Sequence, residues 1–141
     1  MFKLLILLLV FLTVVVPFVF RLIGALTEPE RLKAWEGKRV RKKLESQFGE
    51  FKPDPRMQKI GHRLGVAGGV HGTFYKVPGK MVNAAALPNG DIIVWQGLLN
   101  MVGKNDAQLA SVLAHELGHL KHEHYIQRIY WSALMQFAFG L

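Results

Sequence analysis

The chain has 141 residues, half of them hydrophobic, and carries a formal net charge of +8. This length fits a single small domain beside any membrane segment. The sequence contains no cysteine, which excludes disulfides, a cysteine-ligated zinc and a thiol nucleophile.

The N-terminal segment has the composition of a membrane helix. Residues 4–20 are apolar apart from Thr13, and the apolar character resumes after Arg21. A helix of this length spans about 25–35 Å, which brackets a hydrocarbon core of about 30 Å. We therefore expect residues 1–27 to be a single, uncleaved membrane anchor. A cleaved signal peptide is the alternative, and Ile23 fits poorly at its −3 position.

Residues 28–52 are expected to form a basic amphipathic helix, which the pattern places over Glu30–Phe51. Six basic residues lie between Lys33 and Lys43. Next to an anchor, such a patch suits anionic lipid headgroups. It lacks the interleaved aromatic residues and motifs of a nucleic-acid site, so we expect no nucleic-acid partner. The positive-inside rule favours a cytoplasmic flank, whereas Lys3 favours the opposite orientation, so both sides of the membrane stay open.

Residues 53–141 are expected to form the main domain, in which Pro53-Asp54-Pro55 ends the preceding helix. Helices are predicted over Arg56–Val66 and Gln96–Met101, and strands over Thr73–Val77, Met81–Leu87 and Ile92–Trp95. Asn89-Gly90 predicts a hairpin turn between the last two strands, because Asn-Gly supplies the positive φ angles such turns need. Since helices and strands segregate along the chain, the expected class is α+β with a small antiparallel sheet.

The segment His115-Glu116-Leu117-Gly118-His119 carries the strongest chemical signal. Residues four apart share one helix face, so both imidazoles can reach one zinc ion at about 2.0–2.1 Å. Glu116 lies about 100° around the helix, where it can reach a metal-bound water without being a ligand. Asn105 as N-cap and the apolar stripe that follows predict the helix itself. The sequence thus predicts one zinc ion, with Glu116 as general base in peptide hydrolysis.

The third metal ligand is unknown from the sequence, although catalytic zinc sites normally have three. The metzincin extension needs a glycine at position 122 and a histidine at 125, where the chain has His122 and Tyr125. Glu123 lies about 12 Å from His115 along the helix axis, too far to share its ion. We therefore expect a truncated sequence, in keeping with the uncapped apolar run at 129–141. A degenerate enzyme is the alternative.

Several spaced motifs together resemble a known family. They are Val82–Gly90, Ile92–Val94, Gly97–Leu99 and Leu113–His119. They resemble the HtpX and CAAX-prenyl-protease type of membrane zinc metallopeptidases, peptidase family M48, over about Pro55 to Ile126. The resemblance implies a gluzincin domain with the motif helix beneath the sheet. It also implies zinc ligands at His115 and His119 and a catalytic glutamate at Glu116.

The same resemblance implies that an edge strand pairs with extended substrate. Its residues are Asn83, Ala84, Ala85 and Ala86. In the family, the third ligand, a glutamate, and the transition-state-stabilising residue lie further downstream. We therefore expect a membrane-anchored zinc endopeptidase of the quality-control type, acting on extended or misfolded chains. The alternative is a catalytically inactive, membrane-bound zinc- or peptide-binding remnant that lacks the third ligand.

Overall fold

The structure is a computed structural model that describes residues 2–27 and 29–122. The chain divides into an N-terminal unit that ends at Lys33 and a second unit that begins at Ala34. Each unit is described by itself.

The N-terminal unit is helical in its described part. Helix α1 (Phe2–Val10), the π-helical turn η1 (Phe11–Val15) and helix α2 (Val16–Thr27) follow one another directly. The π-helical turn precedes Pro17, whose missing N–H interrupts the regular hydrogen-bond ladder. Lys3–Gly24 is, by length and composition, one helix that could cross a membrane. The predicted helix is therefore confirmed, and its insertion into a membrane stays a prediction.

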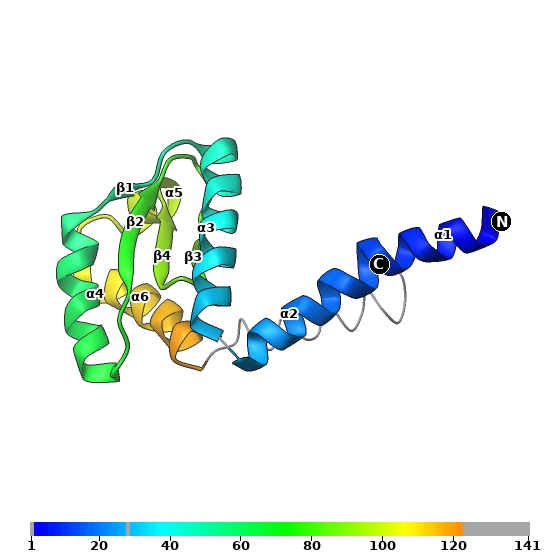
Figure 1. Cartoon of the computed structure of the whole chain (residues 1–141). Helices are drawn as coiled ribbons and strands as arrows, with labels where there is room; N and C mark the ends of the chain where they lie inside the picture. The colour runs from blue at the N-terminus through cyan, green and yellow to red at the C-terminus, as the bar shows by residue number, and fades with distance from the viewer. Residues whose placement is uncertain (1, 28, 123–141) are drawn as a thin grey trace. The chain divides into compact units, whose positions relative to one another are not determined.

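The second unit combines helices with one four-stranded sheet (Figure 1). Helix α3 (Pro29–Phe48) begins in the first unit and belongs to the second from Ala34 onward. The other elements of the second unit are β1 (Lys52–Pro53), α4 (Pro55–Gly68), β2 (Thr73–Val77), β3 (Ala84–Ala86), β4 (Asp91–Trp95), α5 (Gln96–Val102) and α6 (Asp106–Lys121). The strand order is β1-β2-β4-β3. The α+β class is confirmed.

The sheet is mixed, so the expectation of a purely antiparallel sheet is wrong. Strands β1 and β3 pair antiparallel with their neighbours, but β2 and β4 run parallel. The chain passes from β2 to the outer strand β3, and the hairpin then returns β4 into the space between them. The pattern of apolar residues marks the strands, but it carries no information about this order.

Element boundaries follow local signals, with three departures from expectation. Helix α3 ends at Phe48, because Gly49 adopts a positive φ of 94°. Strand β3 is shorter than the predicted extended segment, and β1 was not predicted. Helix α4 begins at Pro55, within one residue of the predicted start, and Asp54 caps it by accepting a hydrogen bond from the Met57 N–H at 2.9 Å. It ends at Gly68, and Gly69, which adopts the left-handed conformation, caps this end.

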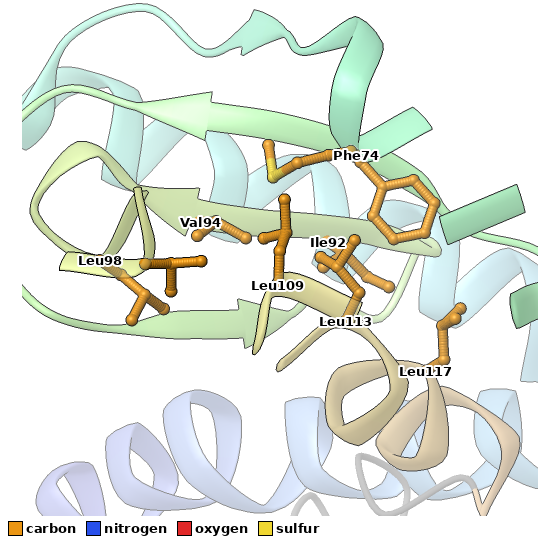
Figure 2. Close-up of a cluster of buried hydrophobic side chains, with 9 residues drawn as sticks. Phe74, Ile92, Val94, Leu98, Leu109, Leu113 and Leu117 are labelled. Carbon is orange, nitrogen blue, oxygen red and sulfur yellow. The ribbon is translucent and has the colours of Figure 1, made fainter. Parts of the chain in front are cut away.

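The sheet buries both faces, because successive residues of β4 alternate between two apolar clusters. The first cluster, shown in Figure 2, joins the sheet to α4, α5 and α6; it contains Met57, Phe74, Ile92, Val94, Leu98, Val102, Leu109, Leu113 and Leu117. The second contains Phe51, Val77, Leu87, Ile93 and Trp95, with Val40, Leu44 and Phe48 of α3 packed on it. Helix α3 therefore covers one face of the sheet, and α4 and α6 cover the other.

Candidate functional site

Helix α6 carries the predicted metal-binding motif and is fixed at its start. The Asn105 side chain accepts a hydrogen bond from the Gln108 N–H at 3.1 Å, which is the expected N-cap. Asp106 occupies the first turn, where a carboxylate interacts favourably with the helix dipole. It also forms a 2.8 Å ion pair with Arg56, which joins α6 to α4. The N-terminal boundary predicted from sequence is confirmed.

The two motif histidines lie side by side on the exposed face of α6. The Nε2 atoms of His115 and His119 are 3.1 Å apart, and the ring planes are at 87°. Two nitrogen ligands of a tetrahedral zinc ion, each at about 2.0–2.1 Å, lie about 3.3 Å from each other. The observed separation is close to that value. The donor atoms present therefore fit two positions of a zinc coordination sphere.

Glu116 has a different environment from the histidines beside it. Its side chain is buried, with 8% of its surface exposed, whereas both histidines are exposed. On α6 it lies between the histidines and the apolar stripe of Leu109 and Leu113. This position brings a carboxylate next to the nitrogen pair without placing it on the same exposed face.

The described residues do not complete the metal site. Within 2–27 and 29–122, no group of three His, Cys, Asp or Glu side chains could hold a metal ion. Glu123 and Tyr125, which the sequence argument considered, lie outside the described residues. The geometry thus supplies a two-histidine half-site with an adjacent carboxylate.

The predicted substrate strand is the last strand of the sheet. Asn83 accepts a hydrogen bond from the backbone of β4 at 3.1 Å, and Leu87 donates one at 2.7 Å. In an antiparallel pair, alternate residues make these bonds. Ala84 and Ala86 therefore direct their peptide groups toward the outer edge of β3. This edge is suited to pairing with an extended chain.

Asn83 has a second role that the sequence did not indicate. Its side-chain Oδ1 accepts the outward N–H of Ala84 at 2.9 Å. The N–H and C=O groups of Ala86, in contrast, point away from β4, toward the outer edge of the sheet. The side chains of Ala84 and Ala86 pack with the first apolar cluster, on the α6 side of the sheet. That of Ala85 packs with the second cluster, on the α3 side. Because α6 packs against β3, the histidine helix and the strand edge adjoin each other.

An ion pair joins α3 to the hairpin that forms the edge. Arg41 contacts Asp91 at 3.0 Å and Glu45 at 3.0 Å, and its guanidinium lies 4.2 Å from the Tyr75 ring centroid. Asn89 donates a further hydrogen bond to Asp91 at 2.9 Å. Burial lowers the pKa of Arg41, but hydrogen bonds to Tyr75, Glu45 and Asp91 outweigh it and raise the pKa above its ordinary value. No local pattern in the sequence predicts this contact, because Arg41 and Asp91 are 50 residues apart.

Comparisons with known proteins agree with this geometry. Residues 52–141 match the model of a family described as Peptidase family M48. A stretch of 59 residues is 44% identical to the mitochondrial metalloendopeptidase OMA1 of Arabidopsis thaliana. That alignment covers 40% of this chain and 12% of the relative, so the matched region is a small part of the relative's length.

Proposed function

The chain belongs to peptidase family M48, and we propose that it is a membrane-anchored zinc metalloendopeptidase. In this proposal residues 1–27 form a single anchor, residues 28–52 a basic helix and residues 53–141 the peptidase domain. The family match begins at residue 52, which supports a peptidase domain that begins at about residue 53. The apolar helix over Lys3–Gly24 supports an anchor within residues 1–27.

The observation that carries the proposed chemistry is the 3.1 Å histidine pair next to a buried carboxylate. His115 and His119 would hold one zinc ion through their Nε2 atoms. Bound there, a zinc ion would supply Lewis acidity, which would polarise the scissile carbonyl and lower the pKa of a water molecule toward neutrality. Glu116 accepts the proton of the attacking water and delivers it to the leaving amine. Because Glu116 is buried, the local dielectric is low, and the electrostatic attraction between its carboxylate and a nearby positive charge is stronger than in water.

The proposed substrate is a polypeptide in extended form. Ala86 directs its N–H and C=O outward from β3, and Ala84 its C=O, while the Ala84 N–H is bound to the Asn83 side chain. These outward groups support recognition by added-strand pairing. Pairing of this kind recognises the backbone, which every unfolded chain exposes. The recognition is thus compatible with a quality-control protease that degrades misfolded proteins of varied sequence.

Zinc binding tests the metal half of the proposal. The chain, purified in detergent and stripped of metal, is titrated with zinc in the wild type and in His115→Ala and His119→Ala variants. We expect one zinc ion per wild-type chain and a loss of at least tenfold in affinity in each variant. His62→Ala removes an exposed histidine from α4 and serves as the matched control. Equal affinities in all four proteins would contradict the ligand assignment.

A peptide-binding experiment separates the enzyme from its alternative. If the zinc-loaded chain binds an unfolded polypeptide but releases no cleaved product, the non-catalytic zinc- or peptide-binding remnant is the correct assignment. We expect cleavage instead, with the substrate's peptide bonds hydrolysed in a zinc-dependent manner.

A further inference from the structure

The outward face of α3 combines positive charge with an exposed aromatic residue. Trp35, Lys38, Arg39 and Lys42 follow a spacing of three and four residues, so they lie on one side of the helix. All four are exposed, and Trp35 exposes 54% of its surface. The Arg39 guanidinium lies 5.5 Å from the Trp35 ring centroid. We call these four residues the α3 outer face.

The carboxylates of α3 near this face lie beside arginine side chains. Glu36 is buried, with 5% of its surface exposed, and lies 4.0 Å from Arg39 at the margin of the face. Glu45 is bound to Arg41, which itself contacts the sheet. Because Lys38, Arg39 and Lys42 are exposed whereas Glu36 is buried, the α3 outer face presents a net positive charge together with the indole ring.

We propose that the α3 outer face rests on an anionic phospholipid surface. Lysine and arginine side chains near such a surface are attracted to its negative headgroups, and tryptophan favours the headgroup level because its ring is amphipathic. The apolar helix able to cross a membrane ends at Gly24, shortly before Trp35 in the sequence. The inference rests on the proposed membrane anchoring, and it is independent of the zinc chemistry.

This contact fixes where the histidine helix lies relative to the bilayer. Val40, Leu44 and Phe48 attach α3 to one face of the sheet, whereas α6 packs on the opposite face. A lipid surface against α3 is then separated from α6 by the sheet, a distance of about 20 Å for two packed layers. His115 and His119 face water, not lipid. The substrate class is therefore extended segments outside the hydrocarbon core.

The absence of cysteine from the sequence allows a direct test with single labelled positions. Ser46→Cys places a fluorophore on the exposed side of α3, and Ser111→Cys places one on the exposed side of α6. The full chain is reconstituted into vesicles of zwitterionic lipid or of mixed zwitterionic and anionic lipid. A nitroxide on the lipid headgroups quenches labels at the surface. In anionic vesicles we expect at least threefold stronger quenching at position 46 than at position 111.

Charge reversal tests whether the basic residues of the α3 outer face cause the contact with anionic lipid. The variant K38E/R39E/K42E should reduce quenching at position 46 to the level seen in zwitterionic vesicles. Each basic residue near an anionic surface raises the equilibrium constant for contact with that surface about fivefold. Removal of three such charges should therefore lower this constant about 100-fold. The variant K59E/R63E/K104E makes the same change of charge at exposed positions outside α3 and should leave the quenching unchanged.

Several results would overturn the inference. Equal quenching at positions 46 and 111 would contradict the orientation, and equal losses in the two triple variants would contradict the assignment to the α3 outer face. If K38E/R39E/K42E lost affinity for a single-stranded oligonucleotide while its quenching persisted, the face would be a nucleic-acid site. A chain that fails to float with vesicles refutes the anchor and the inference together, whereas one that floats without quenching at position 46 refutes the inference alone.

Discussion

Glu116 and the two histidines share one helix but occupy different environments. The imidazoles of His115 and His119 are exposed with their Nε2 atoms 3.1 Å apart, and the Glu116 carboxylate is buried beside the apolar stripe. This arrangement separates the groups suited to hold a metal ion from the group suited to move a proton. It follows from the helical spacing alone, which is why these three residues could be identified from the sequence.

Arg41 should contribute measurably to stability. Arg41→Ala leaves Asp91, which exposes 6% of its surface, without its guanidinium partner. We expect the free energy of unfolding to fall by about 2 kcal/mol, since a nearly buried carboxylate loses a charged hydrogen bond. Urea unfolding in detergent micelles measures it. Lys42→Ala, at an exposed position on the same helix, is the control, and an equal loss in both variants would show that the Arg41 contact has no special role.

Gly61 is expected to be essential for the packing of α4. A methyl group at this position would overlap the Phe74 ring, which lies in the core. We expect Gly61→Ala to lower the free energy of unfolding by about 1–3 kcal/mol. Gly68→Ala, on the same helix, meets only an ordinary contact with Val70 and should be neutral or slightly stabilising. Thermal unfolding of both variants distinguishes the two outcomes, and similar midpoints would refute this explanation.

At the scale of elements, we propose that the outer strand β3 pairs with the extended substrate. Proline at Ala86 removes an N–H that is directed outward, so the sheet keeps its own hydrogen bonds. Ala86→Pro should therefore keep the fold and weaken binding of an extended peptide at least tenfold, as measured by fluorescence anisotropy.

Ala85→Pro provides the contrasting case. The Ala85 N–H is directed at β4, opposite Ile93, so proline there should disrupt the hairpin and lower the unfolding temperature. If Ala86→Pro bound peptide as well as the wild type, substrate recognition at this edge would be excluded.

The elements themselves were predicted where a local signal exists. Asn105 caps α6 as predicted, and Gly90 adopts a φ of 89° in the predicted hairpin turn. The parallel pairing of β2 with β4 was not predicted, nor was the contact of Arg41 with Asp91, which are 50 residues apart. Such features depend on how the chain returns in space, and neither periodicity nor turn residues specify that.

At the scale of the whole molecule, the sheet separates two surfaces to which we assign different roles. Helix α3 covers one face and presents basic residues and Trp35 outward, and α6 covers the other and presents the histidine pair. In our proposals, lipid contact and peptide hydrolysis therefore take place on opposite faces of one small domain. Both proposals begin from the sequence, but the sequence does not predict that the two surfaces lie on opposite faces of the sheet.

The central claim is that Glu116 is the general base of a zinc-dependent peptidase, and one measurement tests it most directly. Wild type and Glu116→Gln are compared for zinc content and for the rate of cleavage of an unfolded, labelled protein. We predict that the variant keeps one zinc ion per chain while kcat falls at least 100-fold, because glutamine cannot accept the proton of water. Cleavage by Glu116→Gln at the wild-type rate would contradict the claim.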